Sequence, residues 1–439
     1  MSVTFLCRKR AARARHNRAV LGLFPNSAAV ENGELMLGGL RSSALADEFG
    51  TPLVVYCEQT LQEAARAYRR AAPGALVVYG TKAFPNVALM RLLAAEGLGA
   101  DVSTLGELRL AQRADVPAER LVVHGNNKSD EELQGAAEAD VGYVVLDSLD
   151  EVERARAAGV RRVLVRITPG IEADTHEAIR TAQLGSKFGL PPDDALEALS
   201  LALDATLVVA GLHVHVGSQL LDGRAVRATI DALASFAARA RAELGWTPAV
   251  LDLGGGLAIR YVEDDVVPAI EDFVADLREW LEQAWEQHEL PRPRLVLEPG
   301  RSLVGRAAVT LYRVGSVKHA SETTTYVAID GGMSDNPRPQ LYGARHTALL
   351  ANRAVEAPTG YYAVCGKHCE SGDVLIERVR LPEPRRGELL AVPATGAYTL
   401  GMGSNYNGVP RPAAVLVAAG RAQLIRLRET IDDLLRYEA

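Results

Sequence analysis

The stretch from Ala75 to Pro85 contains the first group in this chain that could act as a nucleophile. An apolar run ends at Gly80, Lys82 follows two positions later, and a proline then starts a helix-like segment. This pattern predicts a buried strand with an amine at its carboxyl end, where α/β folds keep their active sites. On its own, Lys82 is explained as a solvated charge. Beside suitable partners, a partly desolvated amine loses its proton and attacks carbonyl groups to form an imine.

Polar residues or glycines also follow seven other short apolar runs. The eight predicted strands are 75–80, 99–103, 120–124, 142–146, 162–167, 208–215, 249–253 and 294–298, and amphipathic helix-like segments such as Val87–Glu96, Glu107–Arg113, Leu149–Ala158, Asp193–Ala202, Arg224–Leu244 and Ile270–Gln287 lie between them. Eight strand-helix units in about 250 residues predict an α/β fold of the TIM (β/α)8 type, in which all strands end at one mouth. A doubly wound sheet is the alternative, although no G-x-G-x-x-G sequence follows the first strand. The strand ends offer Lys82, Ser103, His124 with Asn126, Asp147, Arg166, His215 with Ser218, Gly254-Gly255-Gly256, and Glu298 with Gly300 and Arg301.

A second, β-rich domain is predicted after about Ser302, where the helical alternation stops. Strand-like runs there are Ala307–Val317, Thr325–Asp330, Tyr361–Val364, Asp373–Arg378, Glu388–Pro393 and Ala413–Ala418, which is typical of a barrel or sandwich. Glu34–Leu40 has a similar character and is expected to pair with this domain. We therefore predict a disordered basic N-terminus at 1–20, a segment joining the β domain at 21–52, the barrel at 53–305 and the β-rich domain at 306–439. The long polar loop Ile171–Gly189 is predicted to cover the barrel mouth.

The composition limits the classes of function. A net charge of -7 argues against a nucleic-acid partner, and no apolar run approaches the length of a membrane span. The basic segment 8–18 is open to two interpretations, an organelle transit segment or a frayed, solvated terminus. The four cysteines suggest neither a disulfide framework nor a zinc site, so a reducing compartment, the cytoplasm, is expected.

Three features near the end of the predicted barrel give the mouth its chemistry. Gly254-Gly255-Gly256 removes three side chains after the seventh strand, where barrels commonly bind phosphate with backbone N–H groups, although a tight turn needs glycine too. His213 and His215 alternate with valines and are expected on one face of a strand, where packing or stacking competes with metal binding. Glu298 follows a buried strand, so its carboxylate needs a partner, either Arg301 or a protonated heterocyclic nitrogen.

Together these groups predict a cofactor. Pyridoxal 5'-phosphate needs four such groups. Its aldehyde would form an imine with Lys82, its phosphate would bind to the glycines, its ring would stack on His215, and its ring nitrogen would face the buried Glu298. A carboxylate beside the ring nitrogen favours the pyridinium, which accepts electrons when a bond at the substrate α-carbon breaks. No metal is expected.

The chain resembles the alanine-racemase-like, fold-type III pyridoxal-phosphate enzymes and, among them, the diaminopimelate decarboxylase family. The resemblance runs from roughly Asn32 to near the C-terminus. It rests on ten motifs in the family's order, which occupy residues 79–83, 124–128, 175–177 with 186–189, 213–219, 254–256, 298–301, 330–335, 338–342, Cys369-Glu370-Ser371-Gly372-Asp373, and Gly396-Ala397-Tyr398.

The resemblance implies roles for individual residues. The cofactor would be bound by Lys82, covalently, and by His215, Ser218, Gly255, Gly256, Glu298, Gly300 and Tyr398. The substrate would be bound by Arg301, Arg338, Tyr342, Glu370 and Tyr398, with Lys82 and Cys369 as the catalytic residues. It further implies a homodimer, because Cys369 and Glu370 reach the active site of the partner subunit in this family. Three of these residues also have simpler explanations: Arg338 as a surface charge, Tyr342 as a packed aromatic side chain and Cys369 as a small, buried apolar residue.

The implied reaction is decarboxylation of meso-2,6-diaminopimelate to L-lysine and CO2, the last step of lysine biosynthesis. Decarboxylation of ornithine, arginine or a carboxylated polyamine is the nearest alternative, although enzymes acting on ornithine typically carry Cys-Asp where this chain has Cys369-Glu370. A racemase, or a non-catalytic protein that binds the cofactor, remains a further alternative. The sequence departs from the family in Gly401–Val409, so the packing of the site is expected to differ there and the reaction to be the same.

Overall fold

The computed structural model describes residues 20–170, 186–220 and 223–439. These residues form two compact units. One comprises the described residues up to Leu61, together with Ile259–Val266 and Val304–Ala439; the other comprises Gln62–Ala258 and Val267–Leu303. Of the predicted basic terminus, only residue 20 is described. Of the predicted loop Ile171–Gly189, only residues 186–189 are described, and the motif at 175–177 lies outside the described residues.

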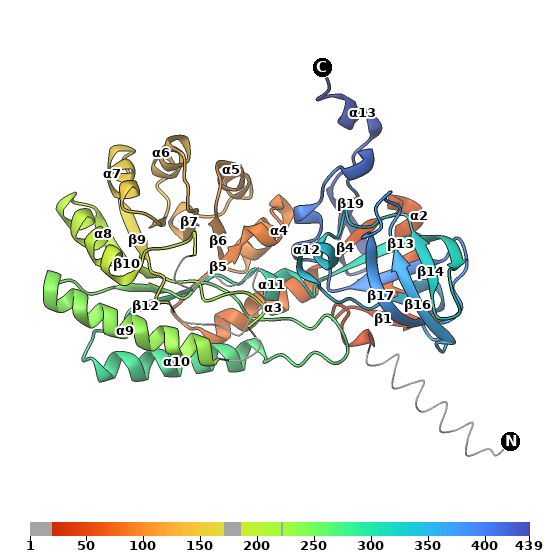
Figure 1. Cartoon of the computed structure of the whole chain (residues 1–439), viewed down its shortest axis with the longest axis horizontal. Helices are drawn as coiled ribbons and strands as arrows, with labels where there is room; N and C mark the ends of the chain where they lie inside the picture. Colours follow the sequence, from red (N-terminus) through yellow and green to blue (C-terminus); the bar gives the residue numbers. More distant parts are fainter. Residues whose placement is uncertain (1–19, 171–185, 221–222) are drawn as a thin grey trace, which may run out of the picture. The chain divides into compact units, whose positions relative to one another are not determined.

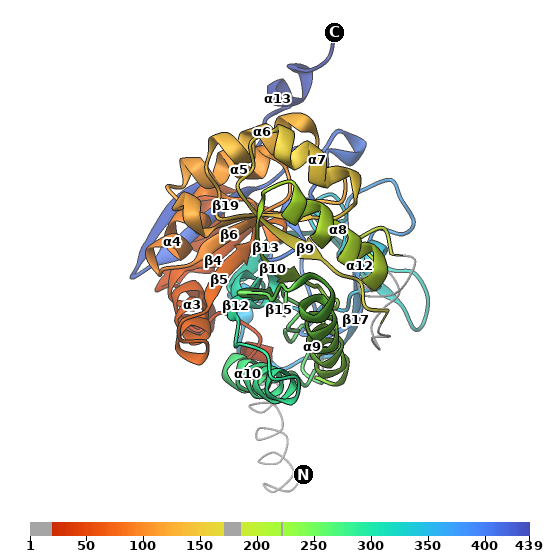
Figure 2. The same ribbon diagram turned by 90° about the vertical axis from the view of Figure 1, so that its left-hand side faces the viewer.

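The second of these units is a closed eight-stranded parallel barrel, as predicted, so the doubly wound sheet is excluded. Its strands neighbour one another in chain order: β5 (Leu76–Gly80), β6 (Gly99–Val102), β7 (Leu121–Val123), β8 (Tyr143–Leu146), β9 (Arg162–Arg166), β10 (Val208–His213), β11 (Val250–Asp252) and β12 (Arg294–Leu297). Figure 2 shows helices around these strands. They are α4 (Val87–Ala95), α5 (Leu105–Arg113), α6 (Asp130–Glu138), α7 (Asp150–Ala157), α8 (Pro192–Asp204), α9 (Arg224–Leu244) and α10 (Ile270–Gln287), with α3 (Glu58–Ala71) before β5 and α11 (Arg301–Val304) after β12.

Side chains from six of the strands fill the barrel interior. Leu76, Val78, Val122, Val145, Leu164, Val250 and Val296 form one buried cluster. The loops at the carboxyl ends are fixed by helix caps: Asn86 accepts hydrogen bonds from the first turn of α4, and Ser129 forms a capping box with Glu132 at the start of α6. The packed interior and the capped helices together hold the strand ends rigidly.

The other unit is built on a nine-stranded sheet (Figure 1). Its strands are β4 (Leu53–Cys57), β13 (Ala308–His319), β14 (Thr325–Ile329), β15 (Leu349–Leu350), β16 (Gly360–Cys365), β17 (Val374–Leu381), β18 (Leu389–Pro393), β19 (Ala413–Ala418) and β20 (Arg421–Arg426). Alternate residues of β13 and β18 enter different cores: Val309 and Ala391 pack in one hydrophobic cluster, Val314 and Leu390 in another. This alternation of period two is why the sequence predicted strands here. The unit also contains α2 (Ser42–Phe49), α12 (Arg338–Tyr342) and α13 (Ile431–Leu435).

Two details differ from the predictions. Glu34–Leu40 does not join the large sheet; β2 (Glu34–Leu37) pairs with β1 (Ala29–Glu31) and β3 (Leu40–Arg41) in a separate three-stranded sheet whose apolar side chains pack on the same core. The predicted barrel starts at Leu53, but β4 pairs antiparallel with β13 and parallel with β19. A short apolar strand followed by a helix has the same sequence pattern in both units, so only the pairing distinguishes them.

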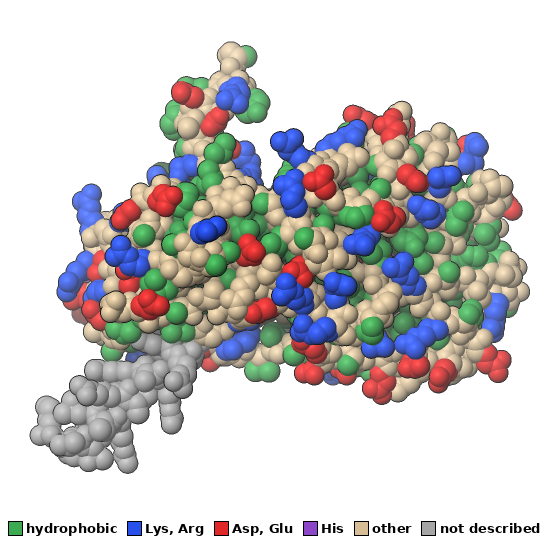
Figure 3. Space-filling view, turned by 180° about the vertical axis from the view of Figure 1, so that it is seen from behind, with side chains coloured by type: hydrophobic (Ala, Val, Ile, Leu, Met, Phe, Trp, Pro, Cys, Tyr) green, Lys and Arg blue, Asp and Glu red, His purple; other side chains and the backbone are tan. Residues whose placement is uncertain are grey.

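Charged side chains of both signs are interspersed on the face shown in Figure 3. No described helix combines the length and the apolarity needed to span a lipid bilayer.

Candidate active site

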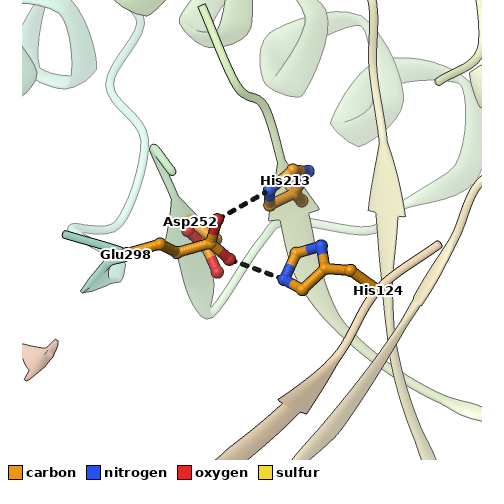
Figure 4. Close-up of side chains that lie close together, drawn as sticks. All are labelled: His124, His213, Asp252 and Glu298. Atoms are coloured by element: carbon orange, nitrogen blue, oxygen red, sulfur yellow. Dashed lines mark ion pairs between the residues drawn. The ribbon is translucent and has the colours of Figure 1, made fainter. Parts of the chain in front are cut away.

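Four side chains from four strand ends meet at the carboxyl end of the barrel (Figure 4). His124 follows β7, His213 ends β10, Asp252 ends β11 and Glu298 follows β12. One carboxylate oxygen of Glu298 (Oε1) lies 2.6 Å from His124 Nε2, and the other (Oε2) lies 3.6 Å from His213 Nε2. The predicted convergence of strand ends is therefore observed, with Glu298 at its centre.

The two imidazoles stabilise the charge of Glu298. Burial alone would raise the pKa of Glu298, but His124 and His213 outweigh it and hold this pKa well below its ordinary value. Burial would likewise lower the pKa of His124, but Glu298 and Asp101 outweigh it and raise the pKa. In His213 burial dominates and lowers the pKa to about 4. The favoured state is an imidazolium at His124, a carboxylate at Glu298 and a neutral imidazole at His213.

The neighbouring carboxyl groups of Asp101 and Asp252 are harder to ionise than that of Glu298. Burial raises the pKa of Asp101, in β6, to about 7. Burial and the charge of Glu298 raise the pKa of Asp252 well above its ordinary value, while Asp252 Oδ1 accepts the N–H of Gly254 at 2.9 Å. Glu298 is therefore the most readily ionised of the three carboxyl groups, because burial and repulsion between neighbouring carboxylates oppose ionisation of the other two.

The glycine run brings three loops into close contact. A Cβ atom on Gly254 would lie 2.5 Å from His215 Nδ1, one on Gly255 would lie 2.4 Å from the carbonyl oxygen of Glu298, and one on Gly256 would lie 2.5 Å from the carbonyl oxygen of Gly217. Gly254 and Gly256 also have φ values of 67° and 119°, which favour glycine. Only residues without side chains permit this approach.

His215 does not share a strand face with His213, contrary to our prediction, because β10 ends at His213. Instead, His215 Nδ1 accepts the N–H of Gly255 at 3.3 Å. Burial lowers the pKa of His215 well below its ordinary value, so the ring is neutral. A neutral, flat ring beside the glycine run is suited to stacking.

The other predicted barrel residues border the same region. Lys82 lies in a 3-10 turn (Thr81–Ala83) and is exposed, while the Thr81 hydroxyl donates to the carbonyl of Asp101 at 2.7 Å and fixes the turn. Arg301 donates to Ser218 Oγ at 3.0 Å. A Cβ on Gly80 would be 3.4 Å from Gly300 Cα, so β5 and the loop after β12 lie side by side. Among the remaining strand ends, Asp147 and Arg166 pair with each other at 3.2 Å.

Five predicted site residues belong to the sheet-containing unit. Arg338 is buried and its guanidinium lies over the ring of Tyr261, 4.0 Å from the centroid, so it is not a surface charge. Tyr342 is half-buried at the end of α12. Tyr398 has a φ of 58°, an uncommon backbone conformation for a non-glycine residue that is worth noting at a predicted binding position.

Cys369 and Glu370 are exposed, so Cys369 is not a buried apolar residue. They occupy a turn held from within by Asp373, whose carboxylate accepts the Met333 N–H at 2.7 Å and lies 2.7 Å from His368 Nδ1. A second support was missed by the sequence analysis: Asn407 Oδ1 accepts the Cys369 N–H at 2.9 Å.

Asn407 belongs to the segment Gly401–Val409 that departs from the family pattern. Its φ of 55° turns the backbone, and the ring of the preceding Tyr406 stacks on His368 at 5.8 Å between centroids. The only sequence signal was a Tyr-Asn-Gly turn, which does not reveal a contact 38 positions away.

Comparison with known proteins decides the family. Residues 58–305 match the family described as "Pyridoxal-dependent decarboxylase, pyridoxal binding domain". The chain is 45% identical over 428 residues to diaminopimelate decarboxylase of Actinosynnema pretiosum subsp. auranticum, covering 95% of both chains. It belongs to the diaminopimelate decarboxylase family. The predicted resemblance is thus confirmed.

Solved structures of related decarboxylases agree with this membership. The crystal structure of diaminopimelate decarboxylase from M. jannaschii in co-complex with L-lysine matches with a TM-score of 0.88 and 32% identity, over 94% of this chain and 98% of that chain. Lysine/ornithine decarboxylase from Vibrio vulnificus, complexed with putrescine, matches with a TM-score of 0.74 and 25% identity, over 85% of this chain and 96% of that chain. Both the fold and the sequence therefore favour the diaminopimelate decarboxylases over this basic amino-acid decarboxylase.

The barrel residues of this diaminopimelate decarboxylase family member fit a pyridoxal group. The glycine run leaves no room for a Cβ and exposes backbone at a barrel position where phosphates bind. Lys82 presents an amine, His215 a neutral ring and Glu298 a buried anion that can accept a hydrogen bond from a ring nitrogen. The chemistry of the donor set thus matches the aldehyde, the ring and the phosphate.

Proposed function

We propose that this chain removes CO2 from meso-2,6-diaminopimelate to give L-lysine, with pyridoxal 5'-phosphate as cofactor. The observation that carries the proposal is the 45% identity, over 95% of both chains, to a diaminopimelate decarboxylase. The match to a related enzyme in co-complex with L-lysine supports the product.

In the barrel, each group has a defined task. Lys82 would present its amine to the cofactor aldehyde, His215 would lie against the ring, Glu298 would accept a hydrogen bond from the ring nitrogen, and the backbone of Gly255, Gly256 and Gly300 with Ser218 would bind the phosphate. When bound, pyridoxal phosphate supplies a ring that accepts the electron pair left by the departing carboxylate. Arg301, which donates to Ser218 at 3.0 Å, orients this hydroxyl and binds a substrate carboxylate.

The substrate has a second amino-acid head, which needs both a cationic and an anionic partner. The buried Arg338 and the half-buried Tyr342 bind the carboxylate of this head, Glu370 binds its ammonium group, and Tyr398 contacts both cofactor and substrate. Such polar partners discriminate strongly, since a substrate lacking either charge leaves the matching group unpaired. Cys369 is the proton donor to the α-carbon, for which its exposed thiol is accessible.

A second copy of this chain is the proposed partner, with Cys369 and Glu370 completing the partner's site. The C-terminal segment supports this proposal. The start of this segment is fixed by Glu429, whose carboxylate accepts a hydrogen bond from Arg411 Nε at 2.6 Å. Four large apolar side chains on either side of Glu429 are exposed: Leu427 by 75%, Ile431 by 58%, Leu435 by 60% and Tyr437 by 85%. Such side chains are typical of a surface that another chain covers. Light scattering of wild type and Ile431→Asp/Leu435→Asp tests the dimer; a monomeric wild type contradicts it.

We also propose that the protein works in the cytoplasm. The cysteines that the structure describes, Cys57, Cys365 and Cys369, are all free thiols, as expected in a reducing compartment. Cell fractionation checks this location.

CO2 release is the test of the reaction. Purified protein is assayed with meso-diaminopimelate, ornithine, arginine and L-lysine in parallel, and its absorbance is recorded. Release from diaminopimelate alone is expected, and both release and the visible cofactor band are expected to disappear in Lys82→Ala. Lys318→Ala, which changes an exposed lysine of the β-rich unit, is the matched control. Release from ornithine or arginine instead would favour the alternative decarboxylases, and a cofactor band without any release would contradict a decarboxylase.

A further inference from the structure

We propose that His124 and His213 are positioning residues, which hold the Glu298 carboxylate through both of its oxygens so that it faces the ring nitrogen of the cofactor as an anion. This inference rests on the proposed function and assigns a role to two histidines that do not themselves bind the cofactor.

The contacts that carry the proposal are buried, and one of them is short. Glu298, His124 and His213 are only 8%, 7% and 1% exposed. The two imidazoles approach different oxygens of one carboxylate, at 2.6 Å and 3.6 Å, and their own rings meet edge to face at 4.7 Å between centroids. Each side chain leaves the end of a different barrel strand, so the carboxylate is held between rigid elements (Figure 4). An isolated carboxylate at this depth would become protonated.

The two histidines have different tasks. His124 Nε2 also lies 3.6 Å from Asp101 Oδ1, so carboxylate groups approach it from β6 and from the end of β12, and they favour its imidazolium form. The positive charge of Arg166, on β9, opposes this only as a smaller effect. His213 stays neutral because it is the more deeply buried of the two. His124 therefore supplies the charge, and His213 limits the rotation of the carboxylate.

A metal ion is the competing interpretation, because the ligand atoms of His124, His213, Asp252 and Glu298 all lie within 4.8 Å of one another. Two atoms bound to one tetrahedral zinc are about 3.3 Å apart, given metal-ligand distances of about 2.0 Å. The 2.6 Å between His124 Nε2 and Glu298 Oε1 is shorter than that and lies near the roughly 2.7–2.9 Å expected between a charged N–H group and a carboxylate in direct contact. The distance favours a direct ion pair between the imidazole and the carboxylate over a metal ion that bridges them.

The test compares two cofactors. Apoprotein is titrated with pyridoxal phosphate and with an analogue that has carbon in place of the ring nitrogen, and the ratio of the two dissociation constants is measured. In His124→Gln, which keeps an N–H donor but loses the charge, the preference for the natural cofactor is expected to fall about 10- to 100-fold, the range for a hydrogen bond to a charged group. A smaller fall is expected in His213→Gln. His288→Gln, at the end of α10, is the matched control and should leave the ratio unchanged.

Each outcome has a defined meaning. If both cofactors bind less tightly by the same factor, the histidines are merely structural and the proposal is wrong. If wild type does not bind pyridoxal phosphate, the proposed function itself fails. Nitrogen NMR of ring-labelled histidine in the wild-type apoprotein is independent of any variant: a doubly protonated His124 near pH 7 is expected, and a neutral one overturns the proposal. Stoichiometric zinc retained by the purified protein would overturn it as well.

Discussion

Gly255→Ala should damage cofactor binding although it adds only one methyl group. Gly255 has an ordinary backbone conformation, so an alanine meets no backbone strain there and its effect comes from its Cβ alone. That Cβ would lie 2.4 Å from the carbonyl oxygen of Glu298 and 3.2 Å from its carbonyl carbon. Both are backbone atoms, which cannot turn away as a side chain would.

The size of the effect follows from this distance. An ordinary contact begins at 3.4 Å, so the loop after β11 and the end of β12 must separate by about 1 Å. The displacement moves Glu298 relative to Lys82 and pulls the Gly255 N–H from His215 Nδ1, which it reaches at 3.3 Å in the native structure. Because an added carbon in a closely packed region costs roughly 1–3 kcal/mol, and binding must restore the native spacing, we expect the affinity for pyridoxal phosphate to fall by about 10- to 100-fold.

Fluorescence titration of the apoprotein with pyridoxal phosphate measures this affinity. The matched control is Gly245→Ala at the end of α9, where nothing lies within 4 Å of the added Cβ but φ is 66°. This control should lose about 1 kcal/mol of stability and bind the cofactor normally. The reasoning is refuted if Gly255→Ala binds pyridoxal phosphate within about threefold of wild type, or if the two alanine variants behave alike.

Three further predictions concern positions away from the glycine run. Asn407→Ala removes the acceptor of the Cys369 N–H and should lower turnover about 2- to 10-fold without changing cofactor affinity, as one neutral hydrogen bond is lost; steady-state kinetics with a cofactor titration check this. Burial raises the pKa of Asp335 to about 7, so the folded state holds a proton that the unfolded chain releases above about pH 4. Stability should therefore fall as pH rises from about 4 to 7, by at most about 4 kcal/mol from this group, and thermal unfolding of Asp335→Asn should show less of this fall. Lys128→Met should destabilise the protein by about 3 to 5 kcal/mol because it leaves the carboxylate of Glu151, 3.0 Å away, buried and unpaired. Unfolding of Lys128→Met/Glu151→Leu, which should recover much of the loss, is the comparison.

The barrel could be predicted from the sequence because its strands are short, apolar and separated by amphipathic helices. Both faces of a parallel strand are buried, so runs such as Leu121–Val123 stand out against the polar helix faces between them. The pattern failed at Leu53–Cys57, which is equally apolar and is also followed by a helix. Pairing partners distant in sequence decide which sheet such a strand enters, and local pattern carries no information about them.

The candidate site could be predicted as a set of strand ends but not as a set of contacts. Glu298 and His124 were placed at the mouth because each follows an apolar run. Asp252 was missed because it stands inside the predicted strand 249–253, and its contact with the Gly254 N–H depends on where β11 ends. Which strand ends touch is set by the stagger of the barrel strands, a property of the closed sheet as a whole.

The groups that contact Glu298 could not be predicted from the sequence, and their identity matters for the chemistry of the site. From the sequence, a buried carboxylate at that position called for a cation, and the choice lay between Arg301 and a protonated ring nitrogen. An arginine bound to both oxygens would occupy the carboxylate with a charge that cannot be removed. The structure provides imidazoles instead, one charged and one neutral. The two imidazoles keep Glu298 an anion. Because an imidazole, unlike a guanidinium, can release its proton, the carboxylate remains able to accept a hydrogen bond from a ring nitrogen, which a permanent ion pair with arginine would oppose.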